Sequence, residues 1–113
     1  MDEAVVKRIM PHSNEAEQAV IGSMMMDQEA ITVAMEKLSD ADFYNKQYGS
    51  LFKAMVELYN EGREGDLVTI KTKLEEMDVP SEVISIDFIR NILDMVPTSA
   101  NIKQYAILYM KSQ

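Results

Sequence analysis

The side chains that could do chemistry in this sequence are few and widely spaced. A phosphate-binding loop needs closely spaced glycines with Gly-Lys-Ser or Gly-Lys-Thr opening a helix, and none of the four glycines begins such a triplet. His12 is the only histidine and cysteine is absent, so the three or four N and S ligands of a zinc site are missing. The same histidine is the only imidazole that a hydrolytic triad could use. We therefore expect no catalytic, cofactor-binding or metal-binding residue.

Carboxylates are the one abundant reactive group, but their spacing does not suit catalysis. Glu15 and Glu17 are two positions apart, and such positions on a helix do not face each other. Asp40 and Asp42 match the start of a calcium loop, whose sixth position needs glycine for its sharp turn and would be Asn45 here. We interpret all of these carboxylates as surface charge.

Negative charge is concentrated in the middle of the chain. The net charge is −8, and residues 57–87 hold nine carboxylates against three cations. This stretch would repel phosphate, because proteins draw affinity for nucleic acids from lysine and arginine. Two interpretations stay open, namely a solvated surface that keeps the domain in solution and a site for a basic partner. Under either interpretation, we expect no tight direct binding of DNA.

Helical periodicity dominates the sequence and predicts an all-α fold, a compact orthogonal bundle of about six helices. Apolar residues make up 47% of the chain, which is enough to bury a core in a domain of 113 residues. Residues 1–12 show no period and are expected to form a flexible arm. Residues 13–113 are expected to form the helical domain.

Capping residues and a glycine mark the expected helix ends. Asn14 and Glu17 have the spacing of a capping box at the start of the first helix. Asp27 and Asp66 are expected to cap the second and fourth helices. Gly62 follows the third helix, where a residue with positive φ is needed.

Apolar stripes on the expected helices predict which residues form the core. The third helix has the clearest stripe, and Phe43 and Tyr44 are expected to pack the preceding turn against the core. A fifth helix begins near Ser85 and ends before Pro97, and a last helix begins near Ser99. The stripe residues of the third and fifth helices are Tyr48, Leu51, Phe52, Met55, Leu58, Tyr59, Ile86, Phe88, Ile89, Ile92 and Leu93.

Methionine is unusually common and supplies candidates for contact with partners. There are ten methionines, and residues 24–26 are three in a row. Three consecutive helical residues point in different directions, and methionine serves both as core filler and as an adaptable binding surface. We expect at least one of the three to be exposed and take Met25 and Met26 as candidates. Tyr109 and Met110 are the second pair, because an exposed end of the last helix would form an apolar patch for self-association.

Five segments, in this order, resemble the N-terminal region of DnaB-type replicative DNA helicases. They are Glu15-Ala16-Glu17 within residues 11–22, Asp42-Phe43-Tyr44, Leu51-Phe52-x-Ala54-Met55, residues 66–70, and Asn101-Ile102-x-x-Tyr105-Ala106. Where the family often has a Gly-Gly pair before helix five, this chain reads residues 80–85 without glycine, and a histidine common near Tyr48 is missing. Both departures point to a divergent member from a phage or a plasmid.

The resemblance implies a role. In this family the N-terminal domains of a ring-shaped hexamer pair up as a collar above the ATPase motors, and the collar docks primase, with a helicase loader bound elsewhere or nearby. The chain would then be a non-catalytic oligomerisation and docking domain that runs on into a helical hairpin. ATP and Mg²⁺ would bind the downstream motor of the parent helicase. The expected partners are a second copy, primase and a loader, in the cytoplasm of a bacterial cell.

Two other readings stay open. The helicase-binding domain of a primase resembles this collar domain in fold, although primase places that domain last and residues 11–22 lie near the start here. A stand-alone acidic helical adaptor is the second alternative. No membrane segment is expected, because the longest apolar run, residues 19–26, falls far short of the roughly 20 residues that span a bilayer.

Overall fold

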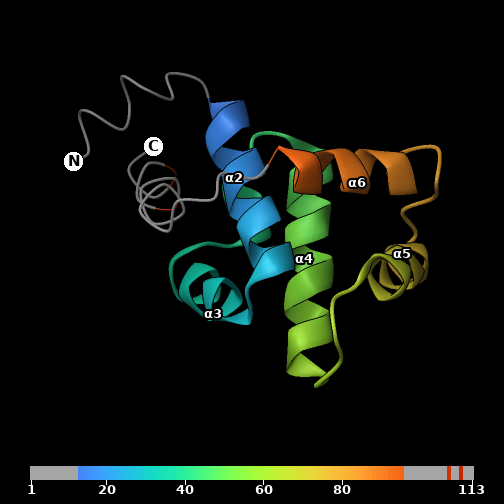
Figure 1. Ribbon diagram of the computed structural model, residues 1–113, viewed down its shortest axis with the longest axis horizontal. Helices are drawn as coiled ribbons and strands as arrows, with labels where there is room; N and C mark the ends of the chain where they lie inside the picture. The colour runs from blue at the N-terminus through green and yellow to red at the C-terminus, as the bar shows by residue number, and fades with distance from the viewer. Residues whose placement is uncertain (1–12, 96–106, 108–109, 111–113) are drawn as a thin grey trace.

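The computed structural model describes residues 13–95 together with Ile107 and Met110 (Figure 1). Its elements are, in order, α2 (Ser13–Met26), α3 (Gln28–Lys37), the 3₁₀-helix η1 (Asp40–Asp42), α4 (Lys46–Asn60), α5 (Leu67–Glu76) and α6 (Ile86–Asp94). The predicted all-α fold is confirmed, and the described part of the chain contains no strand. The arm predicted for residues 1–12 and most of the helix predicted from residue 99 lie outside the described residues.

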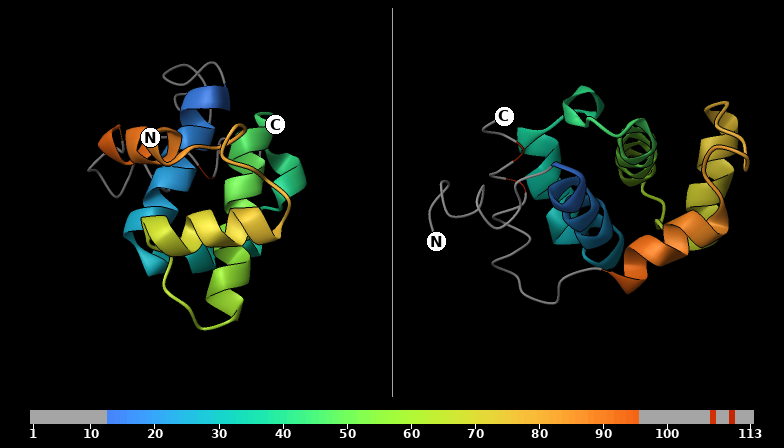
Figure 2. Two further views of the ribbon diagram at one scale, coloured as in Figure 1. Left: turned by 90° about the vertical axis from the view of Figure 1, so that its right-hand side faces the viewer. Right: turned by 90° about the horizontal axis from the view of Figure 1, so that it is seen from above.

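Helix α4 occupies the centre of the bundle. It lies beside α2, and α6 runs at a steep angle to α4 with one end packed against α2 (Figure 1). Seen from above, α4 stands end-on between α3 on one side and α5 on the other (Figure 2). This arrangement is the orthogonal bundle that the helical periods predict.

Local chemistry sets the helix ends as expected. Asp27 accepts the backbone N–H of Glu29 at 2.9 Å and caps α3. Asp66 accepts the N–H of Thr69 at 2.8 Å, while the Thr69 hydroxyl accepts the N–H of Asp66 at 3.0 Å, so α5 begins with a complete capping box. Gly62 has a φ of +72°, as predicted for the residue that ends α4.

The stripe of α4 forms the middle of the core. Its large apolar side chains from Tyr48 to Leu58 are buried, and the ring of Phe43 packs against Phe52 with a centroid distance of 5.2 Å. Burying one such side chain stabilises a fold by about 1.5–3 kcal/mol. The core also takes Ile89 and Ile92 from α6, Ile70 and Leu74 from α5, and Ala16, Val20, Ile21 and Met24 from α2.

Three core predictions are wrong. Tyr59, predicted to lie on the buried stripe of α4, is 36% exposed. Tyr44 is 82% exposed, because it follows Phe43 in an extended segment where successive side chains point to opposite sides. Ile86, the first residue of α6, is also exposed, and the buried face of that helix is instead centred on Ile89 and Ile92.

Glu17 departs furthest from its prediction. It is only 1% exposed, and its two carboxylate oxygens accept the backbone N–H groups of Tyr44 at 2.8 Å and Asn45 at 3.0 Å. The carboxylate therefore does not serve as surface charge, nor does it close the end of its own helix; it fixes the segment that leads into α4. Burial, and then the negative charge of Glu17, raise the pKa of the neighbouring Tyr48.

Candidate protein-docking surface

The consecutive methionines at the end of α2 divide between core and surface, as predicted. Met24 is buried, Met25 is half-buried and Met26 is 60% exposed. Each successive side chain on a helix is rotated by about 100°, so the three methionines point in different directions. Met25 and Met26 are therefore placed where a partner could reach them.

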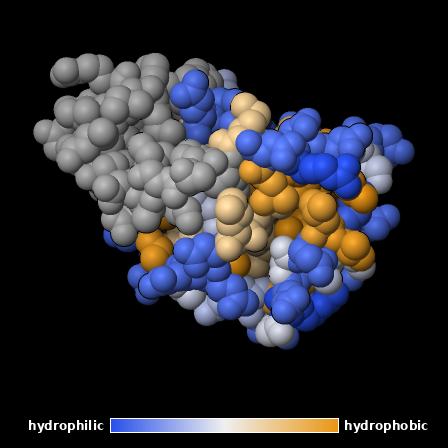
Figure 3. Space-filling view, viewed as in Figure 1, coloured by the Kyte–Doolittle hydropathy of each residue, from blue (hydrophilic) through white to orange (hydrophobic). Residues whose placement is uncertain are grey.

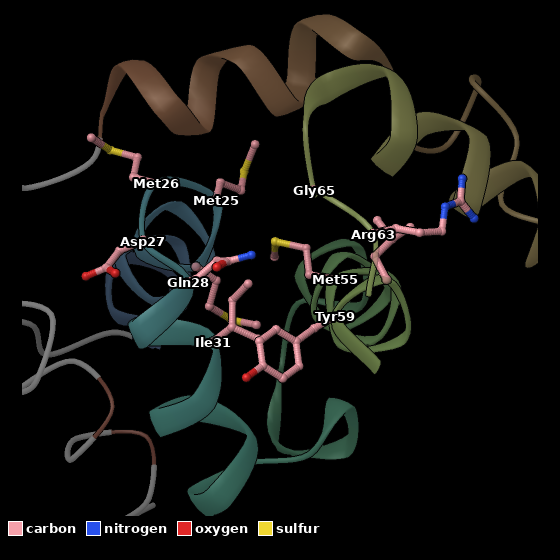
Figure 4. Close-up of a pocket in the computed structure, with 11 residues that line it drawn as sticks. Met25, Met26, Asp27, Gln28, Ile31, Met55, Tyr59, Arg63 and Gly65 are labelled. Atoms are coloured by element: carbon pink, nitrogen blue, oxygen red, sulfur yellow. The ribbon is translucent and has the colours of Figure 1, made fainter. Parts of the chain in front are cut away.

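A small pocket opens beside these methionines. It encloses about 90 Å³ between the end of α2, the start of α3, the face of α4 and the loop at residues 62–66. In the close-up of Figure 4, Met25 points into the space between α2 and the loop at Gly65, and Met55 lies near Ile31 and Tyr59. Arg63 points away from this space. The pocket walls are thus mainly flexible apolar side chains.

A wider depression continues from this pocket across α5 and α6. It encloses about 390 Å³, shares Met25 and Gly65 with the pocket, and is otherwise lined by Asp66, Leu67, Val68 and Leu93. Val68 is 71% exposed. The name methionine surface is used below for Met25, Met26, Tyr59, Leu67, Val68 and Leu93.

Apolar side chains gather on this face. The space-filling view shows a hydrophobic area bordered by hydrophilic residues (Figure 3). Exposed apolar patches rimmed by polar groups are typical of binding sites, and methionine adapts its shape to different partners. The methionine surface can therefore bury apolar groups of another protein.

Tyr109 and Met110 are the second pair of predicted contact residues. Met110 is only 5% exposed and belongs to the core cluster together with Ile107, so the expectation that Met110 is exposed is wrong. Residues three apart share one helix face, and here that face turns inward. Tyr109 lies outside the described residues. Self-association through these two residues stays a prediction.

An ion-pair cluster ties α4 to α5. Lys73 Nζ lies 2.6 Å from Glu61 Oε2 and 3.5 Å from a carboxylate oxygen of Glu76, and the lysine side chain is 8% exposed. Arg63 binds the other carboxylate oxygen of Glu61 at 3.2 Å. The hydrogen bond from Lys73 is the main cause that lowers the pKa of Glu61, and the same bond raises the pKa of Lys73.

The three cations of the acidic stretch therefore form ion pairs or hydrogen bonds within the domain. Besides Arg63 and Lys73, Lys71 donates a hydrogen bond to the carbonyl oxygen of Ile84 at 3.2 Å. Several carboxylates of the stretch, among them Glu64, Glu75, Asp78 and Glu82, are exposed. The outward charge of this region is negative.

The described part of the chain contains no cluster of side chains suited to bind a metal ion. There, no three histidine, cysteine, aspartate or glutamate side chains come close enough to hold a metal ion. Asp42 instead accepts the backbone N–H of Ser39 at 2.8 Å and caps the 3₁₀-helix. Within the same residues, each helix is too short or too polar to cross a bilayer.

Sequence reasoning missed the role of Glu17. The only available signal was its place within the Glu-Ala-Glu segment, because its partners lie 27 and 28 positions further along the chain.

Fold and surface together define a small all-α domain with an apolar contact face. The chain belongs to the DnaB-like helicase N terminal domain family, whose profile matches residues 9–108. It is 38% identical over 106 residues to the replicative DNA helicase DnaC of Bacillus subtilis, and 37% identical to the replicative DNA helicase DnaB of Geobacillus stearothermophilus. Each match covers 94% of this chain and 23% of the relative, so the chain spans about a quarter of those helicases.

A solved structure agrees with this assignment. The N-terminal domain of DnaB helicase from Mycobacterium tuberculosis superposes with a TM-score of 0.75 at 31% identity, covering 86% of this chain and 70% of that one. The predicted resemblance to the N-terminal domain of DnaB-type helicases is thereby confirmed.

Proposed function

We propose that this chain is a non-catalytic oligomerisation and docking domain of a hexameric replicative DNA helicase, and that it binds primase during replication. The observation that carries the proposal is the match of 94% of the chain to replicative helicases of which it covers only 23%. Binding of ATP and Mg²⁺ falls to another part of the parent helicase, since this sequence holds no phosphate-binding loop. A loader would be a further partner of that parent, in a bacterial cytoplasm.

The methionine surface is the face that we assign to primase. It combines half-buried and exposed apolar side chains around a pocket, which is how anchoring residues of a partner are usually received. The acidic exterior disfavours a nucleic acid on the same domain.

The test replaces two exposed side chains of this surface. Met26→Ser and Val68→Ser should each weaken binding of the cognate primase about tenfold in calorimetric titration, because each removes apolar contact area. The melting temperature should change little, because both side chains are mostly exposed in the free domain.

Val83→Ser is the matched control, since Val83 is also exposed but lies away from the methionine surface. If Met26→Ser and Val68→Ser both bind primase as tightly as the wild type, the methionine surface is not the docking site. A wild-type domain that does not bind primase at all would contradict the proposed function itself.

Self-association is the second half of the proposal. The isolated chain should pair only weakly, from monomer to dimer, because Met110, one of the two candidates for self-association, is buried in the core. Light scattering over a range of concentrations measures this directly. A stable hexamer of the isolated chain would contradict it.

The family match favours a helicase over the two alternatives. A helicase-binding domain of a primase would bind the helicase collar instead of primase, so the same titration with each protein separates the two. An acidic adaptor outside replication would bind neither.

A further inference from the structure

A second groove lies between α3 and α4, apart from the methionine surface. It encloses about 350 Å³, and its walls are apolar side chains of Met35, Leu38, Phe52 and Val56. Ser39, Asp40, Lys53 and Glu57 complete its lining. Pockets that hold small groups have volumes of about this size or larger and combine apolar walls with a few polar groups.

Glu57 supplies an unusual polar group here. Its Oε2 atom is buried, and among the described residues no donor lies within hydrogen-bond distance of it. Buried polar atoms in folded proteins nearly always have a partner, since a carboxylate oxygen that has left water without one is costly. The Glu57 carboxylate therefore has one oxygen whose hydrogen-bonding capacity is unused within the described residues, and a donor from outside the domain can use it once the side chain turns toward the groove.

The one cation among the described residues that line the groove, Lys53, does not fill this role. Lys53 lies one turn before Glu57 on α4, is exposed, and makes no ion pair with it. A lysine placed before a glutamate in this spacing is the weaker of the two orientations. Asp40 adds a second carboxylate, so two negative groups and one positive group line the groove.

We propose that this groove receives an arginine side chain from a partner protein. The aliphatic stem of the arginine lies along Met35, Phe52 and Val56, and its guanidinium donates to the carboxylate of Glu57, whose side chain turns toward the groove to meet it. Arginine suits the site because its stem is apolar and its guanidinium is weakly hydrated and directional. The charge of the lining and the unpartnered oxygen both select a cation over a neutral apolar group.

This inference rests on the proposed function in one respect only, that the occupant belongs to a partner protein of the helicase. The groove shares no lining residue with the methionine surface. Its chemistry can therefore be measured with a small probe, whether or not primase binds the domain.

The probe is n-hexylguanidinium, which carries an arginine-like head on an alkyl stem. We expect saturable chemical-shift changes at the methyl groups of Met35, Leu38 and Val56 in spectra of the 113-residue chain. Hexanol, which has the stem without the charge, should bind about tenfold more weakly, because a hydrogen bond to a charged acceptor accounts for a difference of this size.

Two variants test the role of the carboxylate. Glu57→Gln should lower the affinity for n-hexylguanidinium about tenfold, to that of hexanol, while Glu75→Gln, an exposed glutamate on α5, should leave it unchanged. Lys53→Met should raise the affinity, because it removes the cation that competes for the groove. Lys53→Met keeps the test decisive if Glu57→Gln folds poorly.

Equal affinity for n-hexylguanidinium and hexanol would overturn the proposal, as would a Glu57→Gln variant that keeps full affinity. Shifts confined to residues outside the groove would also overturn it, as would domain self-association through the groove that blocks the probe. If the probe binds as expected and primase does not, the proposed function fails and the arginine site stands.

Discussion

At the scale of single residues, Glu17 connects α2 to the segment that leads into α4. It lies in the second turn of α2, and both of its oxygens are used by backbone amides that no helix satisfies. Buried N–H groups left without an acceptor each cost about 1–3 kcal/mol. A side chain with the appearance of surface charge in the sequence is therefore a structural tie between α2 and the start of α4.

Replacing Glu17 by leucine should lower the free energy of unfolding by about 2–4 kcal/mol, because two part-buried amides lose their acceptor. Glu17→Gln keeps one acceptor oxygen and should cost about half as much. Urea denaturation measures both. Glu15→Gln is the control, since Glu15 is exposed, and an equal loss in that variant would argue against the buried tie.

At the scale of elements, the end of α4 depends on one backbone conformation. Gly62 has a φ of +72°, which an L side chain rarely adopts. Gly62→Ala should therefore lower stability by about 1 kcal/mol. Gly65→Ala, in the same loop, should leave it unchanged or slightly raised, because its Cβ would meet Ile70 only at 4.0 Å. Similar melting temperatures for the two variants would count against this account.

The ion pair between α4 and α5 makes stability depend on pH. The pKa of Glu61 lies below its ordinary value of 4.5, so its contribution is present above that pH and is lost as pH falls through the folded-state value. The pKa of Lys73 lies above 10.5, so its contribution is present below that pH and is lost as pH rises through its folded-state value.

Glu61→Gln should consequently flatten the fall in melting temperature between neutral pH and about pH 3, because the variant has no carboxylate to protonate there. Thermal unfolding followed by circular dichroism measures the two slopes. Glu75→Gln serves as the control, as an exposed glutamate outside this cluster. A Glu61→Gln slope that is as steep as the wild-type slope would contradict the assignment.

The sequence predicts the parts of this fold that local chemistry decides. The caps at Asp27 and Asp66 and the turn at Gly62 each depend on residues within a few positions, and all three are confirmed. The position of Glu17 depends on packing between α2 and the segment before α4, which are 27 residues apart. Tyr44 was misplaced for a related reason, because an extended segment alternates its side chains where a helix would not.

The candidate surfaces also differ in how much of them the sequence could predict. Exposure at Met25 and Met26 follows from three consecutive methionines on one helix. The groove at Glu57 needs α3 and α4 to be side by side, and no spacing within either helix indicates it. The inward position of Met110 likewise depends on how the end of the chain packs against the core.

At the scale of the whole molecule, negative charge is in excess, and two of the cations in the acidic stretch are held in contacts within the domain. Lys71 and Lys73 are bound within the domain, and the net charge is −8. Duplex DNA should therefore bind only weakly, even at low salt, where attraction to phosphate is strongest. Fluorescence anisotropy with a labelled duplex measures this. Tight binding that weakens steeply with added salt would show that a cationic face had been missed.

The tie made by Glu17 also has a consequence for how amide protons exchange with solvent. Tyr44 and Asn45 lie between two helices, where backbone amides normally exchange quickly. Their amide hydrogens instead point at a buried carboxylate, so exchange requires α2 to separate from the start of α4. These two amides should thus report the opening of the bundle, with protection close to that of amides inside α4, although the side chain of Tyr44 lies in water.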